Sequence, residues 1–204
     1  KAKLIKKTSM SNKPVIILGS GQTYWDFKDD YLNGHLSGYT TIGISRTIYD
    51  DFIPDIYLTE ISDTQLGRKW LNHLAEILHD KQIEYQHVPI LVKNCGQNKS
   101  FKQYILKKFP NSLKSNVLFT NEFLAPHGTN IIARSFLASR FLTRLIWLTP
   151  AAIQCRSTTY MATLLSFELG ASKVILAGVD GIGGYFFESL PNNKKYLDFH
   201  KKFI

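Results

Sequence analysis

Two short apolar runs, each ending in glycine, set the strongest limit on the fold of this chain. Residues 15–18 read Val-Ile-Ile-Leu and are followed at once by Gly19-Ser20-Gly21-Gln22-Thr23, and residues 174–177 are followed by Gly178-Val179-Asp180. Fully apolar runs of this length are typical of strands buried on both faces of a parallel sheet. Glycine lets the backbone approach a ligand closely. The pattern therefore predicts a buried sheet with ligand-binding turns at its strand ends.

Other apolar runs alternate with stretches of helical period. A helix is predicted over residues 65–81, where apolar residues recur on one side, and a shorter one over residues 99–109, stopped by Pro110. Strands separated by helices imply parallel βαβ units, so we expect an α/β fold with a mostly parallel sheet flanked by helices. The further predicted strands are residues 41–44, 56–58, 85–92, 117–119.

The length of 204 residues and the hydrophobic content of 44% predict one domain. We expect a basic tail over residues 1–13 and a Rossmann-like nucleotide-sugar-binding domain over residues 14–204, and the sequence leaves open a truncation at the carboxyl end. Residues 94–100 read as a polar loop, and residues 121–130 as a flexible connection or a lid over the site.

Cysteine usage and hydropathy predict a cytoplasmic location. Cys95 and Cys155 form neither a metal-binding spacing nor a disulfide framework, which favours a reducing compartment. The sequence contains no apolar run of the roughly 18 residues that a spanning helix needs, and its lysine-rich start lacks the apolar core of a signal peptide.

The formal net charge of +9 leaves nucleic acid, anionic lipid and an anionic small substrate open as partners. Residues 134–147 place Arg134, Arg140 and Arg144 among apolar residues at helical spacing. Such a helix either packs on the core with a basic outer edge or lies on an acidic bilayer, as in peripheral contact with an inner membrane. Nucleic acid is disfavoured because the aromatic residues recur at core spacing.

Hydroxyl residues open the helix that precedes the last predicted strand. Arg156-Ser157-Thr158 begins it and Leu169-Gly170 closes it. The N-terminus of such a helix can bind a phosphate, because its first backbone N–H groups are free and the positive end of the helix dipole lies there. Asp180, just past a buried strand, falls where open α/β sheets bind ligands. The first glycine turn has only Gly-x-Gly, without the rest of a dinucleotide or P-loop motif, so a nicotinamide cofactor is disfavoured.

These patches resemble the bacterial CMP-sialic acid-dependent sialyltransferases with a single Rossmann-like domain. The first glycine turn, residues 54–59 and residues 156–180 are similar to that family's Gly-Asn-Gly-Pro-Ser, its third strand, and its Arg-x-Thr-Ser-Gly followed by a strand ending in Gly-Ile-Asp. The likeness extends to the Kdo (3-deoxy-manno-octulosonate) transferases and to a pterin-pyrophosphokinase-like group. It implies a bacterial glycosyltransferase of lipopolysaccharide or capsule biosynthesis, without cofactor or metal, that moves an acidic 2-keto sugar from CMP to a glycan or lipid-linked acceptor.

The resemblance also implies roles for individual residues. Ser157 and Thr158 hold the donor phosphate, and Ser20 stands near the cytidine phosphate. Arg156 pairs with the sugar carboxylate. Asp180 binds ribose hydroxyls or fixes the following loop, and Tyr185 donates to the departing phosphate. In the glycine turn, Ser20, Gln22 and Thr23 are expected to donate hydrogen bonds at the next helix start.

Three departures from the family pattern bear on the donor and on the base. Ser45-Arg46 stands where the family has a cysteine-asparagine pair, so Arg46 is an alternative carboxylate ligand. The second leaving-group tyrosine of the family is absent after Asp180. The catalytic histidine of the family lies further downstream, which leaves His200 as the candidate general base.

Other catalytic assignments remain open. His127 is the rival base, and a retaining Kdo transferase would use Asp180 or Glu60 as nucleophile. The remaining histidines are expected at the surface: His35, His73, His79, His87.

Two alternatives to a glycosyltransferase stay open. A pterin or nucleotide diphosphotransferase would need metal-binding carboxylates, for which Asp50, Asp51 and Asp55 are the candidates. A non-catalytic nucleotide-binding domain of a larger polysaccharide-assembly protein would need none.

Overall fold

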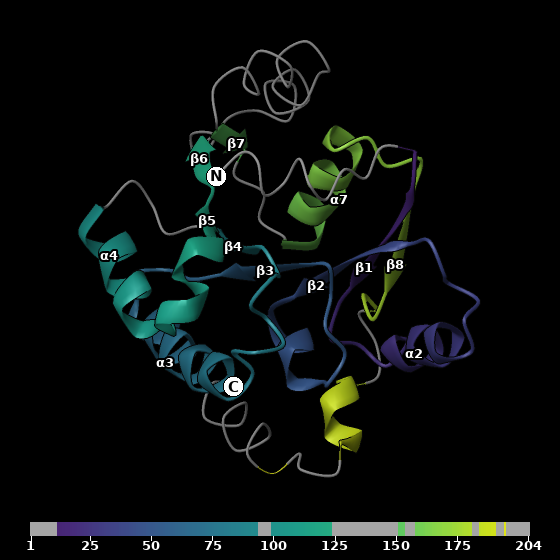
Figure 1. Cartoon of the computed structure of the whole chain (residues 1–204), viewed down its shortest axis with the longest axis horizontal. Helices are drawn as coiled ribbons and strands as arrows, with labels where there is room; N and C mark the ends of the chain where they lie inside the picture. The colour runs from purple at the N-terminus through teal and green to yellow at the C-terminus, as the bar shows by residue number, and fades with distance from the viewer. Residues whose placement is uncertain are drawn as a thin grey trace.

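Six parallel strands form one sheet at the centre of the structure (Figure 1). A computed structural model describes residues 12–93, 99–123, 151–153, 158–180, 184–190 and 194. The strand order is β5-β4-β3-β2-β1-β8, and every neighbouring pair is parallel. The predicted α/β class with a Rossmann-like sheet is confirmed. The strands are β1 (Pro14–Leu18), β2 (Thr40–Ile44), β3 (Ile56–Glu60), β4 (Ile90–Lys93), β5 (Val117–Phe119) and β8 (Lys173–Ala177).

Helices cover both faces of this sheet. On one face lie α2 (Tyr24–Leu32), α3 (Gln65–Asp80) and α4 (Lys99–Lys108), and on the other lies α7 (Thr158–Glu168) (Figure 1). Strands β1 to β5 follow one another outward from β1, and β8 returns to its other side. The strand order thus reverses at β1, which is where sheets of this kind bind ligands beyond the carboxyl ends of their strands.

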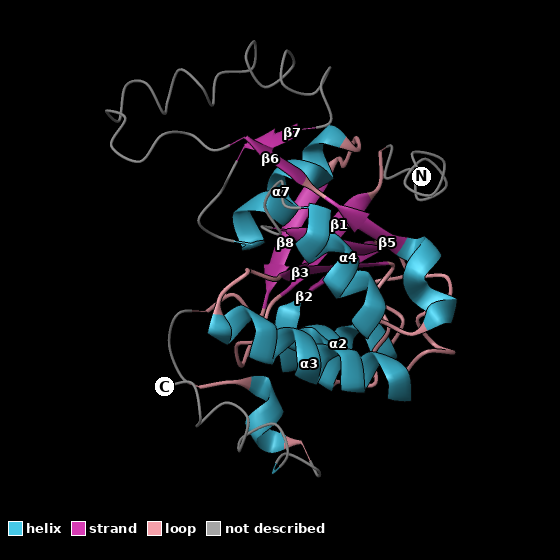
Figure 2. Cartoon of the chain, turned by 90° about the vertical axis from the view of Figure 1, so that its left-hand side faces the viewer, coloured by secondary structure: helices cyan, strands magenta, loops and turns pink. Residues whose placement is uncertain are grey.

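Short elements complete the described chain. Three 3₁₀ turns are present: η1 (Ser45–Tyr49), η2 (Asn111–Asn116) and η3 (Phe186–Ser189). Strands β6 (Asn121–Phe123) and β7 (Ala151–Ile153) pair in parallel as a separate two-stranded sheet (Figure 2).

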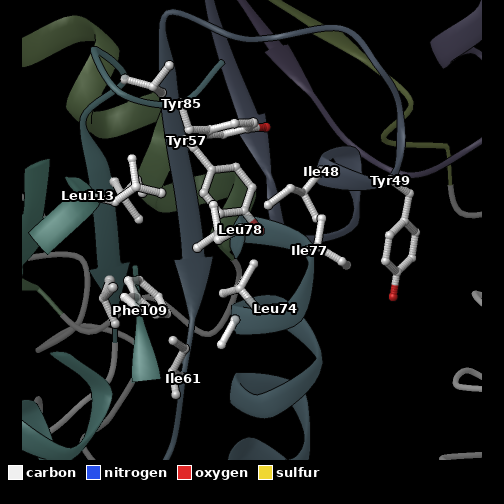
Figure 3. Close-up of a cluster of buried hydrophobic side chains, with 14 of the residues drawn as sticks. Ile48, Tyr49, Tyr57, Ile61, Leu74, Ile77, Leu78, Tyr85, Phe109 and Leu113 are labelled. Atoms are coloured by element: carbon white, nitrogen blue, oxygen red, sulfur yellow. The ribbon is translucent and has the colours of Figure 1, made fainter. Parts of the chain in front are cut away.

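The α3 face carries the larger apolar core. Thr64 caps α3, its side chain accepting a hydrogen bond from the Gly67 N–H at 3.1 Å, which satisfies one of the free donors at the helix start. Leu74 and Leu78 of α3 pack beneath the Tyr57 ring of β3 (Figure 3). The rings of Tyr57 and Tyr85 meet edge to face at 5.9 Å. This packing fixes β3, and with it the strand end that carries Glu60.

The α7 face is closed by a smaller cluster that includes Ala162 and Leu165 of α7 and Ile17 of β1. The helix ends as predicted, because Gly170 adopts a φ of 88° and the Ala171 N–H donates to the Ser166 carbonyl. The chain then enters β8 directly beside β1.

Two local predictions were wrong. The strand predicted over residues 85–92 begins only at Ile90, because residues 81–87 form turns and Tyr85 is buried there by side-chain packing. His73 is buried within α3 rather than at the surface. Helix α4 (Lys99–Lys108) confirms the helix predicted over residues 99–109, and it takes in the last two residues of the predicted polar loop. Of the predicted connection over residues 121–130, the described part is strand β6, and the predicted amphipathic helix at 134–147 lies outside the described residues.

Candidate functional site

The turn after β1 and the end of β8 are in direct backbone contact at the carboxyl edge of the sheet. The Gly19 N–H donates to the Ala177 carbonyl and the Gly21 N–H to the Gly178 carbonyl, both at 2.7 Å. A Cβ on Gly19 would lie 2.2 Å from the Gly178 oxygen. These glycines are therefore needed for the close approach of two chain segments, rather than for the approach of a ligand that the sequence suggested.

Asp180 and Thr23 fasten this contact. The Thr23 hydroxyl donates to Asp180 Oδ1, the Thr23 N–H donates to Oδ2 at 3.3 Å, and the Gly178 N–H donates to Thr23 Oγ1 at 2.9 Å. The hydrogen bond from Thr23 lowers the pKa of Asp180 below its usual value. Asp180 thus joins the end of β8 to the start of α2. Its two implied roles, binding ribose hydroxyls or fixing the following loop, stay predictions.

Gln22 and Thr23 do not act as helix caps. Thr23 is the N-cap residue of α2, yet its side chain makes no capping hydrogen bond. Gln22 Nε2 donates instead to the Tyr185 carbonyl at 3.0 Å. Ser20 differs from both, because its carbonyl accepts from the Phe186 N–H while its hydroxyl makes no hydrogen bond to the described part of the chain. Within the turn, Ser20 is the side chain left to meet a ligand.

Aromatic stacking holds the segment after Asp180 against the sheet. Gly21 and Tyr185 form an antiparallel bridge. The Phe186 ring stacks on Tyr24 of α2 with ring centres 4.2 Å apart, and Tyr185 stacks on Phe187 at 5.0 Å. Tyr185 is thereby brought to the edge beside the glycine turn, where the sequence placed it.

Arg46 approaches Tyr185 from the end of β2. Its guanidinium lies 5.7 Å from the centre of the Tyr185 ring, within range of a cation–π interaction. Its Nε is buried and has no hydrogen-bond partner among the described residues. The preceding residue, Ser45, has a φ of 49°, an uncommon conformation for a residue other than glycine. Arg46 therefore lies beside Tyr185 at the carboxyl edge, and its role as an alternative carboxylate ligand stays a prediction.

Buried polar contacts hold η1, the turn that carries Arg46. The Tyr24 hydroxyl and Lys28 Nζ both donate to the Asp50 carboxylate, the second at 2.7 Å. Burial, reinforced by Asp50, raises the pKa of Tyr24 above its usual range. Lys81 Nζ donates to the Ile48 carbonyl at 3.0 Å, and burial lowers the pKa of Lys81. Asp50 is thus a structural anchor of the turn.

Asp55 and Asp51, the other two candidate metal ligands, also take part in contacts that serve the fold. Asp55 accepts from the Thr41 N–H at 2.8 Å, at the beginning of β2, and Asp51 lies 3.7 Å from Lys81. No three or more His, Cys, Asp or Glu side chains come together as a metal-ion site within the described residues.

A second polar group lies at the ends of β3 and β4. Lys93 Nζ donates to Glu60 Oε2 at 2.9 Å, and Thr158 Oγ1 donates to the same oxygen at 3.2 Å. Glu60 therefore ends its strand at the carboxyl edge, as predicted. Thr158 is bound to a carboxylate, whereas the sequence assigned it to a donor phosphate. Lys93 was missed, although it is a charged residue at the end of an apolar run and directly opposes Glu60 in the strand register.

Several predicted site residues lie outside the described residues. They are Arg156, Ser157, His127 and His200, and their roles stay predictions. The described site thus consists of the glycine turn with Asp180, the Arg46–Tyr185 pair, and the Glu60–Lys93–Thr158 group.

Comparison with known proteins adds no family. The sequence matches no protein-family model and no curated protein sequence. None of the described helices has both the length and the apolar character needed to cross a membrane.

Proposed function

We propose that this protein is a glycosyltransferase that moves an acidic 2-keto sugar, of the sialic acid or Kdo type, from a CMP donor to a surface glycan. The donor binds at the carboxyl edge of the sheet, beside the point where the strand order reverses. The observation that carries the proposal is the Arg46 guanidinium, held over Tyr185 with a buried Nε that has no hydrogen-bond partner in the described chain.

A buried N–H without an acceptor is costly, so a ligand that supplies an acceptor there gains binding free energy. Guanidinium binds carboxylates through two parallel hydrogen bonds, a geometry that a hexose hydroxyl does not match. In sialic acid and Kdo a carboxylate is attached to the anomeric carbon, through which the sugar is transferred, whereas ordinary hexoses have none there. Arg46 therefore favours an acidic sugar over a neutral one.

The neighbouring groups suit the rest of the donor. The Ser20 hydroxyl is available for a phosphate or ribose oxygen, and Tyr185 lies between the glycine turn and Arg46. In the transfer, the bond from the sugar's anomeric carbon to the phosphate oxygen breaks and a bond to the acceptor oxygen forms. CMP leaves with the bonding electron pair, and the acceptor's proton goes to a base, for which His200 is the candidate although the family's own histidine lies further downstream.

The acceptor follows from the same resemblance. A lipid-linked glycan at the inner face of a bacterial inner membrane suits the basic chain, whose net charge of +9 favours anionic surfaces.

A nucleotide screen tests the proposal. Thermal unfolding is measured with CMP, UMP, AMP and ATP, and we expect CMP to stabilise the protein most, by about 2.7 kcal/mol at a hundredfold excess over its dissociation constant. Stabilisation by ATP alone would contradict the proposal and favour the alternative function of a pterin or nucleotide diphosphotransferase. Stabilisation by no nucleotide would leave a non-catalytic interaction domain.

A further inference from the structure

Lys93 is a charged side chain inside the sheet. It ends β4, all of whose residues are buried, and only 1% of its surface is exposed. Lysine is almost never buried to this degree unless it is paired, since removing an ammonium from water costs several kcal/mol. Replacing a buried ion pair by apolar side chains is often neutral or stabilising, so the pair with Glu60 is not explained by stability.

Two donors from different elements converge on one point beside Lys93. Its ammonium and the Thr158 hydroxyl of α7 both donate to Glu60 Oε2, at 2.9 and 3.2 Å. An ammonium has three N–H donors, and Glu60 is the one acceptor that it meets in the described chain. The point of convergence is built for an anionic oxygen, and it lies at the ends of two central strands.

The two partners of the pair differ in their exposure. The Glu60 side chain is 36% exposed, whereas that of Lys93 is 1% exposed. The carboxylate is therefore the partner that borders water, while the ammonium lies within the packing around β4. A ligand anion that replaced the carboxylate would find both donors already in place.

We propose that Lys93 and Thr158 form a binding site for a phosphate-type anion, and that Glu60 is an internal carboxylate that fills this site until the ligand arrives. The inference deepens the proposed function, on which it rests for the identity of the phosphate as that of the donor nucleotide. It explains why the Thr158 hydroxyl, expected to bind phosphate, is found on a carboxylate. Binding exchanges one anion for another, so Glu60 is released to solvent with its charge unchanged.

Calorimetric titration with inorganic pyrophosphate tests this site. Glu60→Gln keeps the size of the side chain and removes the negative charge that competes with the ligand for Lys93. We therefore expect the dissociation constant of pyrophosphate to fall about tenfold, the size of effect expected for one hydrogen bond to a charged group. Lys93→Met removes the fixed donor and is expected to weaken binding by about tenfold or more. Thr158→Val removes a single hydroxyl from the same point, and a several-fold loss is expected there even where Lys93→Met fails to fold.

Asp63→Asn is the matched control. Asp63 pairs with Arg68 on the surface at 2.7 Å, so its replacement makes the same change of net charge without removing a contact to Lys93 or Thr158. Unchanged or weaker binding by Glu60→Gln would overturn the proposal, and so would equal tightening by Asp63→Asn. Pyrophosphate carries no nucleoside. If Glu60→Gln binds pyrophosphate more tightly but CMP stabilises the protein no more than other nucleotides do, the anion site stands and the proposed function fails. If CMP stabilises the protein most but Glu60→Gln does not bind pyrophosphate more tightly, the anion site alone fails.

Discussion

Substitution of Gly19 by alanine probes the contact between β1 and β8 most sharply. The new Cβ would lie 2.2 Å from the Gly178 carbonyl oxygen, whereas carbon–oxygen contacts between strands lie at about 3.3–3.6 Å. Both groups belong to main chains, so no flexible side chain can give way. The two segments must separate by about 1 Å, since that is the difference between the two distances.

That separation disturbs the hydrogen bonds of Gly19 and Gly21 to the end of β8, both of 2.7 Å. Lost hydrogen bonds cost about 0.5–1.5 kcal/mol each and overpacking about 1–3 kcal/mol, so we expect a loss of about 3 kcal/mol in the free energy of unfolding. In a protein of this size that lowers the melting temperature by about 6–12 °C. Thermal unfolding followed by circular dichroism measures the change.

Gly34→Ala provides the control, because Gly34 has a φ of 76° and no atom within 4 Å of the Cβ it would carry. Its cost is backbone strain alone, about 1–2 kcal/mol. A Gly19→Ala variant as stable as the wild type, or no less stable than Gly34→Ala, would refute the close backbone contact.

Two further predictions, which use three substitutions, test polar contacts at and near the site. Thr23→Val removes the hydroxyl that lowers the pKa of Asp180, and we expect a loss of about 1 kcal/mol at pH 7, since this hydrogen bond is exposed. Because the folded pKa of Asp180 is lowered from 3.8, the contribution is present above that pH and is lost as the pH falls through the folded pKa. Urea titrations should therefore show the gap between wild type and Thr23→Val narrowing toward pH 3, and a constant gap would contradict the assignment. Tyr24→Phe deprives buried Asp50 of a donor and should cost about 1.5–3 kcal/mol, whereas Tyr85→Phe should cost little, because the buried Tyr85 hydroxyl has no partner among the described residues. Equal losses in urea midpoint for the two tyrosine variants would remove the special role of Tyr24.

Part of the sheet was predictable from the sequence, because burial on both faces leaves a plain signature. Residues 15–18 are wholly apolar, stop at glycine and form the buried last four residues of β1. Residues 174–177 have the same pattern and form the last four residues of β8, but β8 is an edge strand in which Leu176 is 50% exposed, so the expected burial on both faces is wrong there. The same signature failed at Tyr85, where apolar residues are buried in turns rather than in a strand. Burial determines the residue type there, but it does not determine the backbone conformation.

The site was only partly predictable, because it depends on register between distant segments. The sequence indicated that Gly19 and Asp180 lie at strand ends. It did not indicate that Thr23 would bond to Asp180, since that contact requires β1 and β8 to be neighbours. Lys93 shows the same limit. A lysine after an apolar run is ordinary at a strand end, and only its pairing with Glu60 across two strands makes it notable.

Calorimetric titration of wild type and Arg46→Lys with CMP and with CMP-sialic acid tests the central claim most directly. Lysine keeps the charge and loses the bidentate fork. We expect the wild type to bind CMP-sialic acid more tightly than CMP, and Arg46→Lys to weaken CMP-sialic acid by about tenfold to a hundredfold while CMP binds nearly as before, consistent with about 1.5–3 kcal/mol for hydrogen bonds to a charged group. Equal losses for the two ligands, or no preference of the wild type for the sugar nucleotide, would contradict an acidic-sugar site at Arg46.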